Sequence, residues 1–325
     1  MDADTARTRT CGGHLSPGAC LPALRAAGWL VLLAAAATGA HASEGAAEAA
    51  AQGPLEVFAS IPPQAGILEA IGGEHVRVHV LVQPGQEPHT YEPTPRQIAA
   101  LGTARLYFRI GLPFEGALLA RIGSSRPDST IVDMGAGVPR RFLAGGADAP
   151  DTRAAPQGHD HAGEADPHIW LSPISLPLLA RNAARSLAAI DPLHAETYAR
   201  NLAAYEGRVA AVHQRLAELL APCRGRAFYV FHPAFGYFAD AYGLEQVAVE
   251  REGKPPSPRQ LAELIGRARG EGVKVVFVQP QFDPRSASSV AAGIRGKVVA
   301  LDALAEDAVA SIELIGLRIA EACRE

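Results

Sequence analysis

The sequence predicts an α/β fold of two lobes, each with a parallel sheet flanked by helices, bridged by one long spine helix. Strand-like and helix-like segments alternate through residues 55–133 and again through 227–323, and this alternation is typical of parallel sheets. Between them, apolar residues recur at three-to-five-residue spacing over the 29 residues from 192 to 220. At about 1.5 Å per residue that helix would extend roughly 43 Å, which is long enough to run past two domains.

The first alternating region is delimited by proline and by period-two patterns. Pro62-Pro63 is typical of a helix start, and Thr94 followed by Pro95 predicts another. Valines at 76, 78 and 80 alternate with Arg77 and His79, which predicts a strand with one more solvent-exposed face. His79 is therefore expected to be a solvated residue rather than a ligand. We expect strands at 55–60, 76–80, 104–110 and 130–133, and helices at 62–72, from 95 onward and at 113–122.

The second alternating region follows a helix predicted at 174–190, which stops at Asp191-Pro192. His194 and His213 lie on the predicted spine helix and are expected to be surface or packing residues. Ser257 before Pro258 is a helix start of the same kind as Thr94-Pro95. We expect strands at 227–231, 244–250, 273–278 and 297–301, and helices at 234–242, 258–269, 284–294 and 306–323.

The N-terminus reads as a secretory signal. Residues 26–37 are an apolar run of 12, too short to span a bilayer. Arginines precede the run, and Ala40-His41-Ala42 has the small-x-small pattern of a signal-peptidase site. We therefore expect 1–42 to be removed by cleavage near Ala42. The segment before the apolar run is unusually long, which is compatible with a start codon downstream of Met1.

Two cysteines, Cys223 and Cys323, remain after the signal is removed. An even number in an oxidising compartment predicts one disulfide, which would close the C-terminal lobe. The alternative is a pair of buried free thiols.

The domain organisation follows from these elements. Hydrophobic residues are 48% and charged residues 20% of the chain, which indicates a globular protein rather than a disordered one. The formal charge of −4 gives no reason to expect nucleic acid or an anionic membrane as partner. We expect a signal peptide at 1–42, an N-terminal lobe at 43–173 with a mobile loop at 140–165, linking helices at 174–221 and a C-terminal lobe at 222–325.

Four residues in the predicted topology are candidate metal ligands. His89 follows the second strand, His232 and Asp302 each follow a strand of the second lobe, and His168 precedes the long helices. Ligands of parallel α/β sheets bind beyond the carboxyl ends of strands, so these side chains can converge between the lobes. Three imidazoles and a carboxylate suit tetrahedral Zn²⁺. On its own, His168 would more often be a surface histidine in a turn.

The same segments resemble the solute-binding proteins of zinc/manganese ABC importers, the cluster A-I family typified by ZnuA and TroA. The resemblance covers essentially all of the mature chain. It rests on Pro-Gly-x-x-Pro-His-x-Tyr-x-Pro-x-Pro at 84–95, Asp-Pro-His-x-Trp-Leu-x-Pro at 166–173, Phe-His-x-x-Phe-Gly-Tyr-Phe at 231–238 and Leu-Asp-x-Leu at 301–304. It implies metal ligands at His89, His168, His232 and Asp302. It also implies a monomer in the periplasm that serves a membrane permease.

The resemblance leaves the cargo to be decided by the ligand set. Manganese-binding relatives often carry a carboxylate at the third ligand position, where this chain has His232, and imidazole favours zinc over manganese. The function expected is high-affinity Zn(II) binding without catalysis. The alternatives are a manganese- or iron-binding or adhesin-type member of the same family, and a zinc hydrolase that uses Glu92 or Glu250 as general base, for which no H-E-x-x-H motif is present.

Two departures from the family pattern are visible. The loop before His168 is short and contains only His159 and His161, whereas many zinc-binding relatives have long loops rich in histidine and acidic residues. These two histidines are either a weak capture arm or part of an ordinary polar loop. Gln279 stands where many relatives have glutamate, so the surroundings of the site can differ here.

Overall fold

The computed structural model describes residues 53–102, 104–123, 130–142, 165–250 and 254–324. These residues contain two four-stranded sheets, and every strand pairs in parallel with its neighbours. The predicted fold class is confirmed. None of the helices in this described part of the chain is long and apolar enough to cross a membrane.

The first sheet has the strand order β2-β1-β3-β4. Its central strands are buried, with Val57 and Ala59 on β1 and Phe108 on β3 at 0% exposure, as expected for strands covered on both faces. The strands run Leu55–Ala59 (β1), Val76–Val80 (β2), Leu106–Arg109 (β3) and Thr130–Asp133 (β4). The carboxyl end of β2 leads directly into the loop that carries His89.

Proline begins each helix of the first half, as predicted. At the start of α3 the Thr94 hydroxyl accepts a hydrogen bond from the Gln97 backbone N–H, while the Gln97 side chain accepts one from the Thr94 backbone N–H at 3.0 Å. This reciprocal cap satisfies two donors that the helix itself leaves unpaired. The helices run Pro62–Gly72 (α2), Pro95–Leu101 (α3) and Pro113–Gly123 (α4).

The second sheet repeats the order of the first, as β6-β5-β7-β8. All four residues of β7 are buried, and α8 has the same kind of cap as α3, made by Ser257 and Gln260. The strands are Ala227–Val230 (β5), Glu245–Ala248 (β6), Val275–Val278 (β7) and Lys297–Ala300 (β8), and the helices are Gly236–Tyr242 (α7), Pro258–Gly270 (α8), Arg285–Gly293 (α9) and Ala308–Arg324 (α10).

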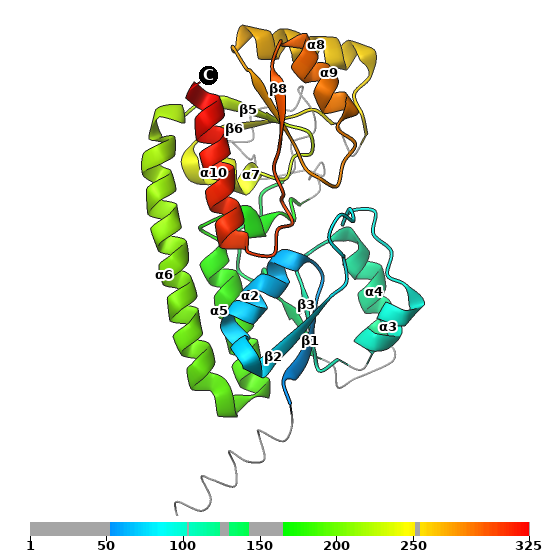
Figure 1. Cartoon of the computed structure of the whole chain (residues 1–325). Coiled ribbons are helices and arrows are strands. Elements are labelled where there is room, and N and C mark those ends of the chain that lie inside the picture. The colour runs from blue at the N-terminus through cyan, green and yellow to red at the C-terminus, as the bar shows by residue number, and fades with distance from the viewer. Residues whose placement is uncertain (1–52, 103, 124–129, 143–164, 251–253, 325) are drawn as a thin grey trace, which may run out of the picture. The chain divides into compact units, whose positions relative to one another are not determined.

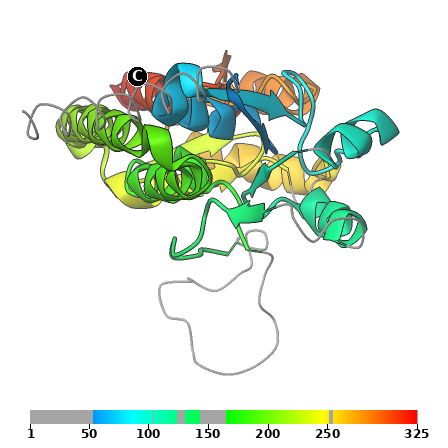
Figure 2. The ribbon, with the colours of Figure 1, turned by 90° about the horizontal axis from the view of Figure 1, so that it is seen from below.

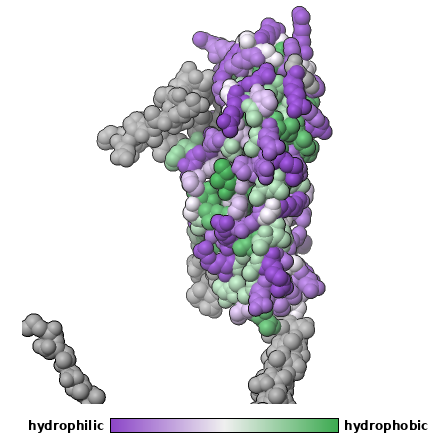
Figure 3. Space-filling model, turned by 90° about the vertical axis from the view of Figure 1, so that its left-hand side faces the viewer, coloured by the Kyte–Doolittle hydropathy of each residue, from purple (hydrophilic) through white to green (hydrophobic). Residues whose placement is uncertain are grey.

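Two helices connect the sheets, α5 (Leu176–Ile190) and α6 (Ala195–Leu220), and they lie side by side (Figures 1 and 2). The 26 residues of α6 span about 39 Å. One face of α6 packs against α2, α5 and α10. The opposite face mixes hydrophilic side chains with alanines (Figure 3). The buried stripe of α6 consists of Tyr198, Tyr205, Val209, Val212, Leu216 and Leu220.

The long helix begins three residues later than the sequence predicted. Pro192–His194 form a 3₁₀ turn, and α6 starts at Ala195. The reason is visible at Asp191, whose Oδ2 accepts hydrogen bonds from His194 Nδ1 at 2.7 Å and Tyr198 Oη at 2.5 Å. The carboxylate therefore bonds side chains instead of capping the first backbone N–H groups.

The surface or packing roles predicted for His79, His194 and His213 are confirmed. His79 Nε2 lies 2.5 Å from Glu56 Oε2 on a half-exposed strand face. His194 stacks on His75 with ring centroids 3.7 Å apart, and His213 Nδ1 lies 3.2 Å from Tyr242 Oη.

Cys223 and Cys323 form the predicted disulfide, with Cα atoms 6.0 Å apart. Cys223 precedes β5, whereas His232 follows it, so the bond lies at the opposite end of the strand from the candidate ligand. It ties the start of the second sheet to the end of α10.

Replacing both cysteines with serine should destabilise the chain without changing its metal affinity. The bond joins residues 100 positions apart, and constraining a loop of that size stabilises a fold by about 2–5 kcal/mol. Urea unfolding measures the loss, and zinc titration of the folded variant provides the comparison. A fall in zinc affinity comparable to that caused by losing a ligand would contradict the conclusion that the disulfide and the candidate metal ligand lie at opposite ends of β5.

Candidate metal centre

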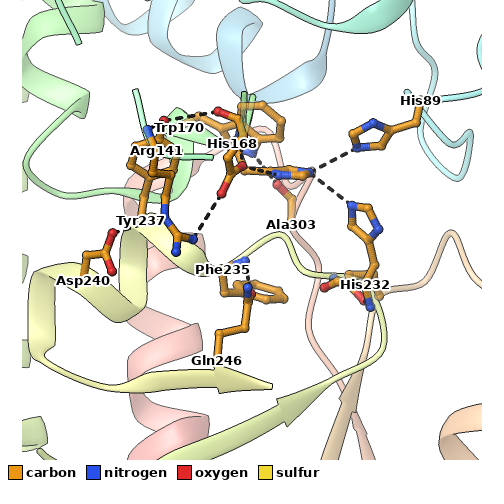
Figure 4. A network of polar contacts seen from close by, with 12 residues as sticks. His89, Arg141, His168, Trp170, His232, Phe235, Tyr237, Asp240, Gln246 and Ala303 are labelled. Carbon is orange, nitrogen blue, oxygen red and sulfur yellow. Dashed lines mark hydrogen bonds and ion pairs between the residues drawn. The ribbon is translucent and has the colours of Figure 1, made fainter. Parts of the chain in front are cut away.

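Three histidine side chains converge from distant parts of the chain. His168 Nε2 lies 3.3 Å from His89 Nε2 and 3.2 Å from His232 Nε2 (Figure 4). One ring nitrogen from each residue falls within a group whose members are all within 4.8 Å of one another. His89 comes from the loop after β2, His168 from the turn before α5, and His232 from the end of β5. Strand ends and a turn thus bring together residues that the sequence separates.

The two nitrogen–nitrogen distances from His168, 3.3 and 3.2 Å, match those of ligand atoms around a small cation. Around a tetrahedral Zn²⁺ with Zn–N bonds of about 2.0–2.1 Å, neighbouring nitrogens lie roughly 3.3 Å apart. The cavity that these rings line measures about 20 Å³, close to the space needed for one water molecule. The enclosed part of the cavity therefore has room for a single ion.

His168 is held by the carboxylate of Asp166. Asp166 Oδ1 accepts from His168 Nδ1 at 2.7 Å and from the His168 backbone N–H at 3.0 Å. Burial raises the pKa of Asp166, but the hydrogen bonds from His168 outweigh it and hold that pKa below its usual value. Burial also lowers the pKa of His168, against the opposing effect of Asp166. The ring is thus a neutral imidazole with its proton on Nδ1 and its lone pair on Nε2.

His232 has a carboxylate partner and a backbone clamp. Its Nδ1 lies 2.6 Å from Glu250 Oε1, and Glu250 is only 6% exposed. The buried Gln279 amide accepts from the His232 N–H at 3.2 Å and donates to the His232 carbonyl at 2.7 Å. The Phe282 ring stacks on the imidazole at 4.9 Å. A carboxylate at position 279 could not donate the second of these hydrogen bonds, so glutamine has its own role in this chain.

His89 is positioned by its own loop. The Glu87 side chain accepts hydrogen bonds from the backbone N–H groups of His89 and Thr90, both at 2.8 Å. Tyr91 Oη donates to the Leu81 carbonyl at 2.8 Å and closes the loop from the other side. Burial, and then the neighbouring His168 and His232, lowers the pKa of His89 to about 3. This imidazole is therefore unprotonated at neutral pH and ready to bind a cation.

Metal-free protein should lose stability as the pH falls below about 6.5. An unfolded histidine binds a proton there, whereas the folded chain keeps His89 neutral down to about pH 3. The unfolded state then binds more protons, so acid favours it. At pH 5.5, one unit below the unfolded pKa, His89 alone should cost about 1 kcal/mol.

Urea unfolding of the metal-free chain at pH 7.5 and 5.5 measures this effect, with His89→Gln as the matched variant. The variant should retain the share of the pH dependence due to His168 and lose about 1 kcal/mol of the total. Equal pH dependence in the two proteins would contradict the low pKa of His89.

Asp302 is placed differently from the three histidines. It lies two residues after the end of β8 and is exposed, and its Oδ1 accepts from Gln281 Nε2 at 3.1 Å and from the Leu304 backbone N–H at 2.9 Å. Its carboxylate is not in the group of converging ligand atoms, although Gln281, Ala303 and Leu304 line the cavity. Three of the four predicted ligands therefore meet, and the role of Asp302 stays a prediction. His159 and His161 lie outside the described residues.

The residues that orient the ligands were not predicted for that role. The sequence places Asp166 in the motif around His168 and marks Gln279 as a departure from the family pattern, without a role for either at the ligands. Glu250 was considered as a hydrolase base, but it contacts His232 instead. The contact between Glu250 and His232 could have been predicted from topology. Glu250 follows β6, the strand that pairs with β5, and so reaches the same sheet edge as His232.

Two parallel sheets and three convergent imidazoles, two of them bonded to carboxylates through Nδ1, define a metal-binding protein with two sheet-containing lobes. Residues 57–315 match the model of the ZnuA family, described as the zinc-uptake complex component A, periplasmic, and the chain belongs to this family. The family consists of metal-binding solute-binding proteins and is not an enzyme family.

Relatives in this family differ in the metal that their names record. The zinc-binding lipoprotein AdcA of Streptococcus pneumoniae is 28% identical over 263 residues, which are 79% of this chain and 52% of AdcA. The chain thus spans about half the length of that relative. The manganese ABC transporter substrate-binding lipoprotein PsaA of Streptococcus pneumoniae is 27% identical over 255 residues, 76% of this chain and 79% of PsaA. A crystal structure of ZnuA superposes with a TM-score of 0.74 at 37% identity, covering 83% of this chain and 99% of the other.

Proposed function

We propose that this chain is an extracytoplasmic solute-binding protein that binds one Zn²⁺ tightly and delivers it to the membrane permease of an ABC importer. The observation that supports the proposal is the orientation of two imidazoles. Asp166 and Glu250 each face an Nδ1 atom, at 2.7 and 2.6 Å. Protons on both Nδ1 atoms leave two Nε2 lone pairs facing each other across 3.2 Å. Two lone pairs repel at that distance unless a proton or a metal cation lies between them, and the metal cation is the occupant that we propose.

Zinc is the cargo that this ligand set favours. All three converging atoms are imidazole nitrogens, which suit zinc, whereas manganese prefers oxygen ligands. Relatives named for zinc and for manganese both occur, so family membership alone does not choose between them. The alternative is a manganese- or iron-binding or adhesin-type protein of the same fold.

Asp302 is the proposed fourth ligand. Its neighbours Ala303 and Leu304 line the cavity, so Asp302 is adjacent in sequence to the proposed metal position. Asp302→Ala should weaken zinc binding while leaving one ion per chain, because the three histidines remain. Equal zinc affinity in Asp302→Ala and the unmodified chain would remove Asp302 from the ligand set. Glu306→Ala, an exposed acidic residue nearby in sequence, is the control.

The proposed site performs no chemistry. Four protein ligands fill a tetrahedral zinc and leave no position for an activated water. Glu250, the better placed of the two candidate bases, is bound to His232 Nδ1, and Glu92 is exposed on the ligand loop. A hydrolase assay on ester and peptide substrates is therefore expected to give only the background rate.

The proposal also covers the compartment of the mature protein and the role of the loop before His168. Removal of residues 1–42 after secretion would place a monomer in the periplasm. There, His159 and His161 would serve as a weak capture arm for metal. The direct test is titration of metal-stripped mature chain with Zn²⁺, which should give one tight site per chain. Failure to bind zinc or manganese tightly would overturn the proposal.

A further inference from the structure

Arg141 connects three parts of the chain around His168. Its guanidinium donates to Asp166 Oδ2 at 3.2 Å, and its Nε lies 3.2 Å from Asp240 Oδ2 on α7. Its backbone N–H donates to Tyr237 Oη at 3.0 Å, and its Cζ lies 5.7 Å from the centroid of the Tyr237 ring. In Figure 4, Tyr237 and Asp240 lie close to Arg141, on the side of it away from His168. The arginine thus joins α7 to the segment that carries a proposed ligand.

The contact with Asp166 is the one that bears on the metal site. Asp166 is fully buried, and its two oxygens have different partners, since Oδ1 binds His168 and Oδ2 binds Arg141. Two partners on opposite oxygens fix the plane of the carboxylate, and that plane sets the direction of the imidazole. By contrast, Asp240 is 63% exposed, and exposed ion pairs contribute little to stability.

Gly236 leaves room for this guanidinium. A Cβ atom at Gly236 would lie 1.0 Å from Arg141 Nη1 and 2.2 Å from its Cζ. Gly236 is the first residue of α7 and is not among the glycines with positive φ. Its backbone conformation therefore does not require glycine, but the space taken up by Arg141 does. An alanine there would displace the guanidinium while leaving every charged residue in place.

We propose that Arg141 is a positioning residue that acts through Asp166 to hold His168 in its metal-binding orientation, and that Gly236 provides the space for it. This inference rests on the proposed metal site. If Arg141 contributed only to the stability of the fold, its removal would leave the orientation of the His168 ring and the zinc affinity unchanged. The proposal is thus distinguished from a structural role by what happens at His168.

A double-mutant cycle tests the proposal, using Arg141→Ala, Gly236→Ala and the two combined. Loss of a residue that hydrogen-bonds a metal ligand costs about 10–100-fold in metal affinity. Arg141 bonds Asp166 rather than the ligand His168 itself, so we expect a loss of about tenfold. Gly236→Ala should cause a similar loss in the unmodified chain and no further loss in Arg141→Ala. Gly266→Ala on α8, where a Cβ would meet nothing within 4 Å, is the matched control and should leave affinity unchanged.

The second readout is the ¹⁵N spectrum of the His168 imidazole in metal-free protein. The unmodified chain should show a single Nδ1–H tautomer, and both single variants should show a mixture. Zinc affinity within twofold of the unmodified chain in Arg141→Ala would overturn the proposal. So would an equal loss from Gly236→Ala with and without Arg141. If the unmodified chain binds no zinc, the proposed function fails, and the metal-free spectrum still decides whether Arg141 orients the ring.

Discussion

Replacing His168 with alanine is expected to cause the largest loss of zinc binding of any single substitution. His168 Nε2 is the atom nearest to both other ligand nitrogens, at 3.3 and 3.2 Å. Its removal takes a bond from the ion and leaves Asp166 buried without its histidine partner. The affinity should fall by more than the roughly 10–100-fold typical of losing an outer partner. Competition with a chromogenic chelator measures the change.

His79→Ala and His213→Ala are the controls for this substitution. Both remove an imidazole outside the site, His79 from a strand face and His213 from α6. Each should leave zinc affinity within about twofold, since neither contacts the three converging rings. If His168→Ala binds zinc as tightly as either control, the three histidines do not form the site.

Replacing Glu250 with alanine is expected to lower zinc affinity by about 10–100-fold without removing a ligand. Glu250 Oε1 lies 2.6 Å from His232 Nδ1, and a carboxylate at that distance favours the tautomer with its proton on Nδ1. Without it the ring can turn or place its proton on Nε2, where the metal must bind. Titration should still give one ion per chain, but with weaker affinity.

Glu263→Ala is the matched control, because Glu263 is an exposed residue of α8 that pairs only with Arg259 among the contacts described. Its affinity should equal that of the unmodified chain. Unchanged affinity in Glu250→Ala would mean that the tautomer of His232 is set by something other than this carboxylate, and would weaken the lone-pair argument for a cation.

The fold was largely predictable because its signals are local. Proline and Thr94 determine where α3 begins, and the alternating valines identify β2. The start of α6 was not predicted correctly, because Asp191 bonds His194 and Tyr198 through side chains whose directions a linear pattern does not contain. The disulfide was predictable from the count of cysteines and the expected compartment.

The site was predictable only in part. Two of the histidines follow from topology, since His89 and His232 come after strands and parallel strand ends share an edge, whereas His168 follows from its place before the long helices and from the resemblance of its motif. The residues around them depend on side-chain directions across neighbouring segments. Asp166 and Glu250 reach Nδ1 atoms, and Arg141 fits only because Gly236 lacks a side chain. Spacing along the chain carries no information about such contacts.

The most direct test of the central claim is a competition titration of the metal-stripped mature chain with Zn²⁺ and Mn²⁺, alongside His232→Ala. The account predicts one tight zinc site, far stronger than manganese binding, and its loss in the variant. Comparable affinity for manganese would contradict the zinc assignment. Tight zinc binding that survives in His232→Ala would contradict the site itself.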